Sequence, residues 1–110
     1  MEPKIHGMGR ILFQDYEYMM LRVSRVSYIP GGPALNMNFI REGTLLLSSN
    51  WQLELPPLLV TPKEEQVVFD REYWAIDGRH RLESYKMANR SHLPAIVGRG
   101  MIIMPKLDTV

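Results

Sequence analysis

The stretch YWAIDGRHRLESYKMANRSHLPAIV, residues 73–97, constrains the fold most, because strand patterns open and close it around a helix pattern. Its first and last few residues are short apolar runs of the kind that buried strands use. Between them Leu82, Tyr85 and Ala88 recur three residues apart, which is the spacing of one helical face. Asn89 follows as a natural helix stop. A strand, a helix and a strand in this order predict an α/β or α+β domain.

Further elements are predicted on both sides of this stretch. Asn36 fits the N-cap of a helix over residues 37–49, although Gly43 inside that helix costs about 1 kcal/mol relative to alanine. The sequence from Gly98 to Gly100 predicts a turn into a last strand. The remaining strand patterns cover residues 18–28, 58–60, 66–69, 73–76 and 101–104, with 66–69 and 73–76 expected to pair as a hairpin.

The composition fits a single domain that folds without disulfide bonds. The chain has 110 residues, of which 45% are apolar and none is cysteine. This excludes disulfides, thiolate metal centres and cysteine nucleophiles. The longest apolar stretch, residues 55–60, is far shorter than the roughly 18–20 residues of a membrane span, and the start of the chain does not resemble a signal peptide. We therefore expect one domain over residues 1–110, a reducing cytoplasmic setting and no membrane partner.

Charge is divided unevenly along a chain whose net charge is only +1. Residues 54–77 carry six acids and two bases, whereas residues 78–99 carry five bases and one acid, Glu83. A net charge near zero argues against a protein that binds nucleic acid through electrostatic attraction alone. An anion site therefore belongs in the second, basic segment.

Three basic residues stand where the predicted helix begins. Asp77 ends the strand, Gly78 permits a tight turn, and Arg79, His80 and Arg81 occupy the first helical turn. Cations are disfavoured there, because free backbone N–H groups and the helix dipole already make that end positive. A bound phosphate would explain them, since it accepts bonds from the backbone, a guanidinium and an imidazole. Beside a phosphate, Asp77 would suit a Mg²⁺ ligand or an acceptor for an attacking hydroxyl.

The segment AIDGRHR at residues 75–81, the small residue Ser84 and the LPAIV strand at 93–97 together resemble the ParB/sulfiredoxin-like superfamily. The LPPLLV segment at 55–60 resembles the entry to another strand of that family, and the likeness spans about residues 18–104. It implies a small α/β (α+β) domain with a short mixed sheet and two or three helices. It also implies a site for nucleotide phosphates that takes ATP, ADP or CTP, with Mg²⁺ as a further expectation.

Carried over residue by residue, the resemblance turns this helix start into a set of candidate site residues. Arg79 departs from the family pattern, because it stands in the place of the sulfiredoxin cysteine, which excludes sulfinic acid reduction. It also stands in the place of the partition proteins' glutamate, which weakens the case for metal-assisted CTP hydrolysis. The candidates are Asp77 as the catalytic or Mg²⁺-binding residue, and Gly78, Arg79, His80, Arg81 and Ser84 as the phosphate- or nucleotide-binding residues.

Three functions remain open at this point. The leading hypothesis is a minimal ParB-like domain that binds a nucleotide or another phosphate-bearing ligand at the DGRHR turn, with phosphotransfer, phosphohydrolase or nuclease activity as variants. The second is a non-enzymatic interaction module of a phage or mobile element, which binds a host or partner protein. The third is an accessory DNA-binding protein that uses the basic face of the helix.

Two features of this region also have purely structural interpretations. Arg81 would pair with Asp77 or Glu83 on the helix surface if no anion bound there. The Gly31-Gly32 pair between two prolines either borders the site as a lid or is simply a turn. Both interpretations stay open at the level of sequence.

Overall fold

The computed structural model describes residues 4–5, 9–63 and 71–104 of the chain. Within them six strands form one sheet in the order β1-β2-β6-β4-β5-β3, together with two α-helices and a short 3-10 helix. The elements in chain order are β1 (Lys4–Ile5), β2 (Gly9–Arg22), η1 (Val23–Arg25), β3 (Val26–Tyr28), α1 (Met37–Ser49), β4 (Leu58–Pro62), β5 (Tyr73–Asp77), α2 (Arg79–Met87) and β6 (His92–Met104).

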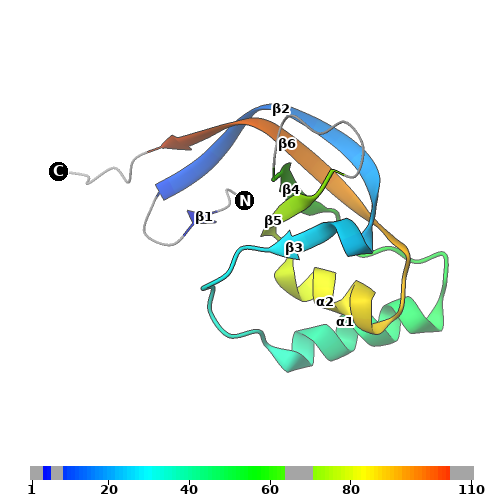
Figure 1. Cartoon of the computed structure of the whole chain (residues 1–110). Coiled ribbons are helices and arrows are strands. Elements are labelled where there is room, and N and C mark those ends of the chain that lie inside the picture. Colours follow the sequence, from blue (N-terminus) through cyan, green and yellow to red (C-terminus); the bar gives the residue numbers. More distant parts are fainter. Residues whose placement is uncertain (1–3, 6–8, 64–70, 105–110) are drawn as a thin grey trace.

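The sheet is mixed, and both α-helices lie on the same side of it (Figure 1). β2 pairs antiparallel with β6 from Arg10 to Arg22, which is the longest ladder among the described strands. β6 pairs with β4 in parallel, β4 with β5 antiparallel, and β5 with β3 in parallel. Because β4 meets β6 only at residues 95–97, β2 and β6 continue beyond it as a ribbon, which β1 joins at the start of β2 (Figure 1).

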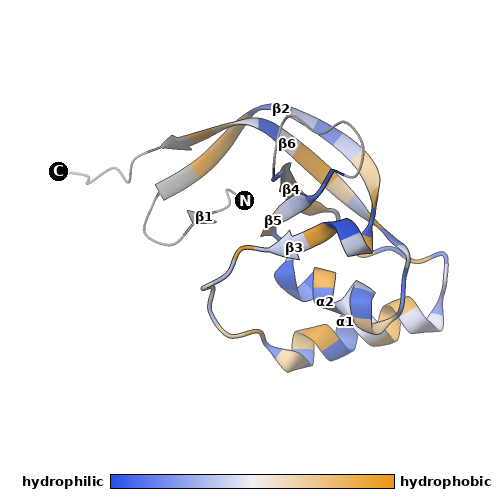
Figure 2. Ribbon diagram, in the orientation of Figure 1, coloured by the Kyte–Doolittle hydropathy of each residue, from blue (hydrophilic) through white to orange (hydrophobic). Residues whose placement is uncertain are grey.

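The core lies between the sheet and α2. Leu93, Ala95 and Val97 alternate along β6 and are fully buried, as expected where one face of a strand packs inward. Figure 2 shows α2 as mostly hydrophilic, so its two large buried side chains, Leu82 and Tyr85, carry its packing against the sheet.

α1 begins at an N-cap and packs closely on α2. The side chain of Asn36 accepts a backbone N–H from the first turn at 3.0 Å, a contact typically worth about 1 kcal/mol. Ile40, Gly43 and Leu47 are the buried residues of the helix. A Cβ atom at Gly43 would overlap Ser84 of α2. The glycine therefore lowers helix propensity but allows the two helices to cross at short range.

Three side chains of α2 and the following turn hold the connection between α1 and β4. Arg90 donates through Nη2 to three carbonyls, at the end of α1 and in the connection, at 2.9, 2.9 and 3.0 Å. The Tyr85 hydroxyl accepts the N–H of Leu55 at 2.9 Å, and Arg81 donates to two carbonyls just before β4. The connection contains no helix or strand, so these side chains satisfy backbone groups that secondary structure leaves unpaired.

Much of the predicted architecture is confirmed. The α+β class with a mixed sheet is observed, and the helix over residues 37–49 has those bounds. The helix that opens at Arg79 ends at Met87, and Asn89 lies in the left-handed region with φ of 56°, as its role as a helix stop requires. The strands predicted at 58–60 and 73–76 lie within β4 and β5.

Two local predictions are wrong. The strand expected over 18–28 begins at Gly9 and is broken by η1, where the N–H of Val23 donates to the carbonyl of Ser91 at 2.9 Å. The turn expected at residues 98–100 does not form, because β2 pairs with β6 on both sides of Gly100, whose φ is 69°. The predicted strand at 66–69 and its hairpin lie outside the described residues. No helix in the described part of the chain is long and apolar enough to cross a membrane.

Candidate functional site

Gly78 connects β5 to α2 in a conformation that favours glycine. Its φ and ψ are 110° and 27°, in the left-handed half of backbone space. A Cβ atom there would lie 2.7 Å from Cγ of Leu58 and 3.1 Å from Nη2 of Arg81. Backbone geometry and space therefore both select glycine at this turn.

The start of α2 presents unpaired backbone donors. The first intrahelical bond runs from the N–H of Leu82 to the carbonyl of Gly78 at 2.9 Å, and no side chain among the described residues caps the helix. The N–H groups of Arg79, His80 and Arg81 precede that bond and have no acceptor within the helix. Together with the helix dipole they make this end electropositive.

Arg81 is committed to other parts of the chain. Its Nη1 donates to the carbonyls of Pro56 and Pro57 at 2.9 and 2.8 Å, and its Nη2 lies 3.5 Å from Oδ2 of Asp77. The pairing with Asp77 is the structural alternative that the sequence left open. Arg81 therefore fixes the entry to β4 and holds the Asp77 carboxylate beside the turn.

His80 joins α2 to the N-terminus of α1. Its Nε2 accepts the backbone N–H of Asn36 at 2.8 Å, and its ring meets the edge of Phe39 with centroids 5.9 Å apart. An Nε2 atom that accepts a bond carries no proton, so the neutral ring is protonated on Nδ1. The imidazole in this arrangement supports the helix cap rather than presenting Nε2 as a donor to an anion.

Arg79 differs from both neighbours. Its guanidinium packs against Gly32, in the loop between β3 and α1, and a Cβ atom at Gly32 would overlap it. Among the described residues Arg79 has no hydrogen-bond or ion-pair partner. The glycine loop thus borders the turn, as one of the two sequence interpretations of Gly31 and Gly32 expected.

Ser84 lies below the turn, in the contact between the two helices. It is 1% exposed, and its hydroxyl is within hydrogen-bond distance of the carbonyls of Ile40 and His80, at 3.0 and 3.1 Å. Ser84 therefore has a packing role in this arrangement, and direct contact with a ligand remains a prediction.

A cavity of about 320 Å³ opens beside the turn, between the two helices. Apolar side chains form most of its walls, and Arg81 and His80 form the end near the turn. It is lined by Phe39, Glu42, Gly43, Leu46, Leu55, Pro56, His80, Arg81 and Ser84. In the described part of the chain no three His, Asp or Glu side chains gather as a metal site.

Comparison with known proteins gives structural neighbours only. No family model matches the chain, and no curated protein is a detectable relative. ParB from Caulobacter crescentus, in a crystal structure with CTP-γ-S, matches with a TM-score of 0.61 and 15% identity over 76% of this chain. Sulfiredoxin from Arabidopsis thaliana matches over the same share with a TM-score of 0.54 and 16% identity.

The chain has the ParB/sulfiredoxin-like fold. A conserved hypothetical protein from Pyrococcus furiosus shares it as well, with a TM-score of 0.56 and 16% identity. The match covers 76% of this chain, but 44% of the ParB chain, 32% of the Pyrococcus protein and 86% of sulfiredoxin. This chain thus spans less than half of the length of that ParB. The fold confirms the predicted resemblance.

The ParB/sulfiredoxin-like fold brings together residues that sequence patterns did not connect with the turn. Asn36, Pro56 and Pro57 meet the turn through backbone atoms, which leave no signature in a side-chain pattern. Gly32 was singled out only as a turn or lid residue, and its contact with Arg79 depends on how β3 and α1 are placed. A Pro-Gly-Gly-Pro loop was the single available signal.

Proposed function

We propose that this chain is a phosphate-binding domain that holds a nucleotide or a related phosphate-bearing ligand at the start of α2. The observation that carries this proposal is the guanidinium of Arg79, which packs against Gly32 and has no hydrogen-bond or ion-pair partner among the described residues. An arginine in that position can form a paired, charge-assisted contact with a phosphate. The structural neighbour ParB, which was crystallised with CTP-γ-S, supports the same ligand class.

The assignment of roles within the turn follows from what each side chain already binds. Arg79 supplies the charged contact and Gly78 lets the backbone approach the ligand closely. Arg81 and His80 act mainly by holding the surrounding segments, because Pro56, Pro57 and Asn36 occupy their hydrogen-bonding atoms. The apolar cavity beside the turn offers space for the remainder of the ligand.

Asp77 fits Mg²⁺ poorly in this arrangement. Its Oδ2 is 3.5 Å from the Arg81 guanidinium, which opposes a second cation at the same oxygen. We therefore favour a binding role without turnover, in which Asp77 orients Arg81.

A melting experiment with and without nucleotide tests the proposal. A ligand at 100 times its Kd adds about 2.7 kcal/mol, which raises the melting temperature of a domain this size by roughly 10 °C. ATP, ADP, CTP and GTP, each with and without Mg²⁺, are the probes. We expect at least one to stabilise the wild type, and Arg79→Ala to weaken binding about tenfold or more without lowering the melting temperature of the free protein.

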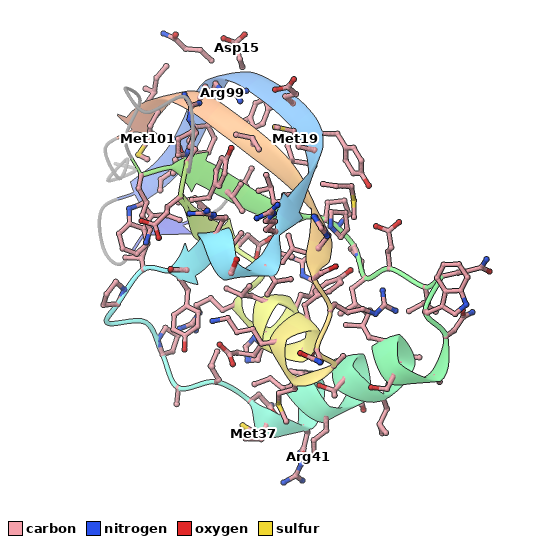
Figure 3. The ribbon with its side chains drawn as sticks, turned by 45° about the vertical axis from the view of Figure 1, so that its right-hand side comes forward. Asp15, Met19, Met37, Arg41, Arg99 and Met101 are labelled. Atoms are coloured by element: carbon pink, nitrogen blue, oxygen red, sulfur yellow. The ribbon has the colours of Figure 1, made fainter. Side chains whose placement is uncertain are left out.

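Two control variants separate ligand contact from folding. Arg41 points away from α1 into solvent and has no partner among the described side chains, so Arg41→Ala removes an equal charge and should change neither property (Figure 3). Arg81→Ala should lower the melting temperature even without ligand, because two carbonyls lose their donor. Wild-type affinity in Arg79→Ala, or no stabilisation by any probe, would exclude the proposed site.

The alternative of an interaction module has its own observation. On and just after α1, Leu45 is 69% exposed and Trp51 is 80% exposed. Large apolar side chains left in solvent in this way are typical of protein contact surfaces. If no nucleotide stabilises the chain, binding of a host or partner protein by this surface becomes the better hypothesis, and loss of that binding in Trp51→Ala is its test.

A further inference from the structure

The face of β2 that points away from the helices exposes a row of large side chains. Tyr16, Tyr18 and Met20 are 53%, 60% and 49% exposed. They alternate along the strand, so they share one face and follow one another at about 7 Å. On the opposite face, Leu21 is part of the core. The row extends onto β6, where Ile96 pairs with Tyr18.

The described β2 and β6 residues of this face carry no negative charge. Residues 16, 18, 20 and 22 of β2 and their partners 98, 96, 94 and 92 of β6 include neither Asp nor Glu. The acids of β2 stand at the alternate positions, and one of them, Glu17, pairs with Arg99 at 3.1 Å. Figure 3 shows Asp15 and Arg99 near each other on the ribbon. This separation of charge leaves the face with Tyr16, Tyr18 and Met20, which we call the tyrosine face, suited to an anionic partner.

A groove with basic walls continues from one end of this row. Arg22 and His92 pair across β2 and β6 at that end, and both line a groove of about 600 Å³. Its lining residues are Arg22, Val23, Ser24, Lys86, Asn89, Arg90, Ser91 and His92, with no acid among them. Arg90 is bound to carbonyls of the α1–β4 connection and Nζ of Lys86 lies 3.5 Å from Oε1 of Glu83, so Arg22 supplies most of the available charge. Arg22 has no partner among the described residues.

The ring of Tyr16 is held by contacts with Phe13 before any ligand binds. The hydroxyl of Tyr16 accepts the N–H of Phe13 at 3.3 Å, and the two rings pack edge to face with centroids 5.8 Å apart. The hydroxyl of Tyr18 lies 4.0 Å from the sulfur of Met20. A surface that is already ordered loses little conformational entropy when a partner stacks on it.

We propose that the tyrosine face and the adjoining groove bind single-stranded nucleic acid. Bases would stack on Tyr16 and Tyr18, and the backbone phosphates would reach Arg22 and Lys86 in the groove. Stacked aromatic rings and a basic channel are the two parts that such sites combine. Duplex nucleic acid does not fit, because its bases are already stacked on each other. This surface is distinct from the start of α2 and does not depend on the proposed phosphate site.

Binding of labelled oligonucleotides, measured by fluorescence anisotropy at low salt, tests this inference. The probes are oligouridylate and oligothymidylate of about ten nucleotides, a length typical of single-strand sites, and a duplex of equal length. We expect saturable binding of either or both single strands and much weaker binding of the duplex. Few phosphate contacts predict a shallow salt dependence, with a slope of about −1 to −2 in a double-logarithmic plot.

The variants separate stacking from charge. Tyr18→Ala should weaken binding about tenfold or more, whereas Tyr18→Phe keeps the ring and should bind like the wild type. Arg22→Ala should weaken binding several-fold, and the matched change Arg41→Ala should not. Arg79→Ala should leave oligonucleotide binding unchanged, which distinguishes this surface from the phosphate site. All of these side chains are exposed or half-buried, and unchanged melting temperatures would show that the fold is intact.

Three outcomes would overturn the inference. They are no saturable binding of either single strand, equal affinity for the duplex, and wild-type affinity in Tyr18→Ala. A dimer in sedimentation that dissociates in Tyr18→Ala, without oligonucleotide binding, would assign the tyrosine face to a second copy of the chain instead.

Discussion

The two ends of α2 differ in how far the rest of the chain engages their arginines. At the C-terminal end, Arg90 is bound to three carbonyls and shapes the α1–β4 connection. At the N-terminal end, Arg81 does the same with two carbonyls, yet Arg79, two residues before it, packs against Gly32 and has no polar partner in the described part of the chain. The contrast shows that a cluster of basic residues is not by itself an anion site. What matters is which guanidinium the fold leaves without a partner.

The helix dipole explains part of this difference. A cation near the C-terminus of a helix is favoured by the partial negative charge there, so Lys86 and Arg90 need no ligand to account for them. A cation at the N-terminus opposes the partial positive charge. Arg81 offsets that cost through Asp77 and two carbonyls, whereas Arg79 has no such compensation among the described residues. An anion at the N-terminal end would supply it.

Removing Arg90 should have the largest effect on stability. Arg90→Ala leaves three carbonyls without their charged donor, and bonds to charged groups contribute about 1.5–3 kcal/mol each. We expect a loss of about 3 kcal/mol in the free energy of unfolding, because one nitrogen serves all three acceptors. Thermal and urea unfolding measure it, with Arg41→Ala as the control. A loss equal to that of the control would show that the connection holds its shape without Arg90.

Gly78→Ala should be the next largest change. Alanine at φ of 110° is strained, and its Cβ would press on Leu58, so we expect a loss of about 2 kcal/mol together with weaker nucleotide binding. Gly31→Ala is the matched control, because Gly31 also has a positive φ, 86°, but nothing lies within 4 Å of its Cβ position. Equal losses in the two variants would mean that backbone strain alone, and not the contact with Leu58, selects glycine at the turn.

Local signals in the sequence predicted most of the fold. The helix at 37–49 was predicted from the N-cap residue Asn36, and Asn89 marks the end of α2. The continuous strand through Gly100 could not be predicted, because two glycines around an arginine look like a turn unless the partner strand is known. The candidate residues at the turn were named from the sequence, but their partners were not. Pro56, Pro57 and Asn36 act through backbone atoms that only the tertiary fold brings to the turn.

Tyr85, in the last turn of α2, tests whether the helix holds the connection along its whole length. Tyr85→Phe leaves the N–H of Leu55 without an acceptor, which should cost about 1–2 kcal/mol. Burial raises the pKa of Tyr85, and the bond from Leu55 offsets part of that rise. The unfolded chain has a tyrosine pKa of about 10, so above that pH the unfolded state ionises first and wild-type stability falls. Phenylalanine does not ionise, so Tyr85→Phe lacks this loss of stability. The difference in unfolding free energy between the wild type and Tyr85→Phe, measured by urea unfolding, should therefore narrow as the pH rises above 10.

The smallest expected effect, and the one that separates a binder from an enzyme, belongs to Asp77→Asn. The ion pair with Arg81 is partly exposed, with side-chain exposures of 38% and 25%, so its loss should change stability by no more than about 1 kcal/mol. The affinity for nucleotides distinguishes the two possible roles of Asp77. If Asp77 only orients Arg81, the change removes a negative charge beside the helix start and should tighten Mg²⁺-free nucleotide binding by about threefold. If Asp77 instead holds Mg²⁺ or accepts a proton, binding with Mg²⁺ should weaken or stay the same, and any turnover should disappear.

Glu83→Gln is the control, since it removes an equal charge whose partner is Lys86. Titration calorimetry with and without Mg²⁺, beside a product assay of the wild type, decides between the two: tighter Mg²⁺-free binding without wild-type turnover supports the binder, and turnover abolished by Asp77→Asn establishes an enzyme.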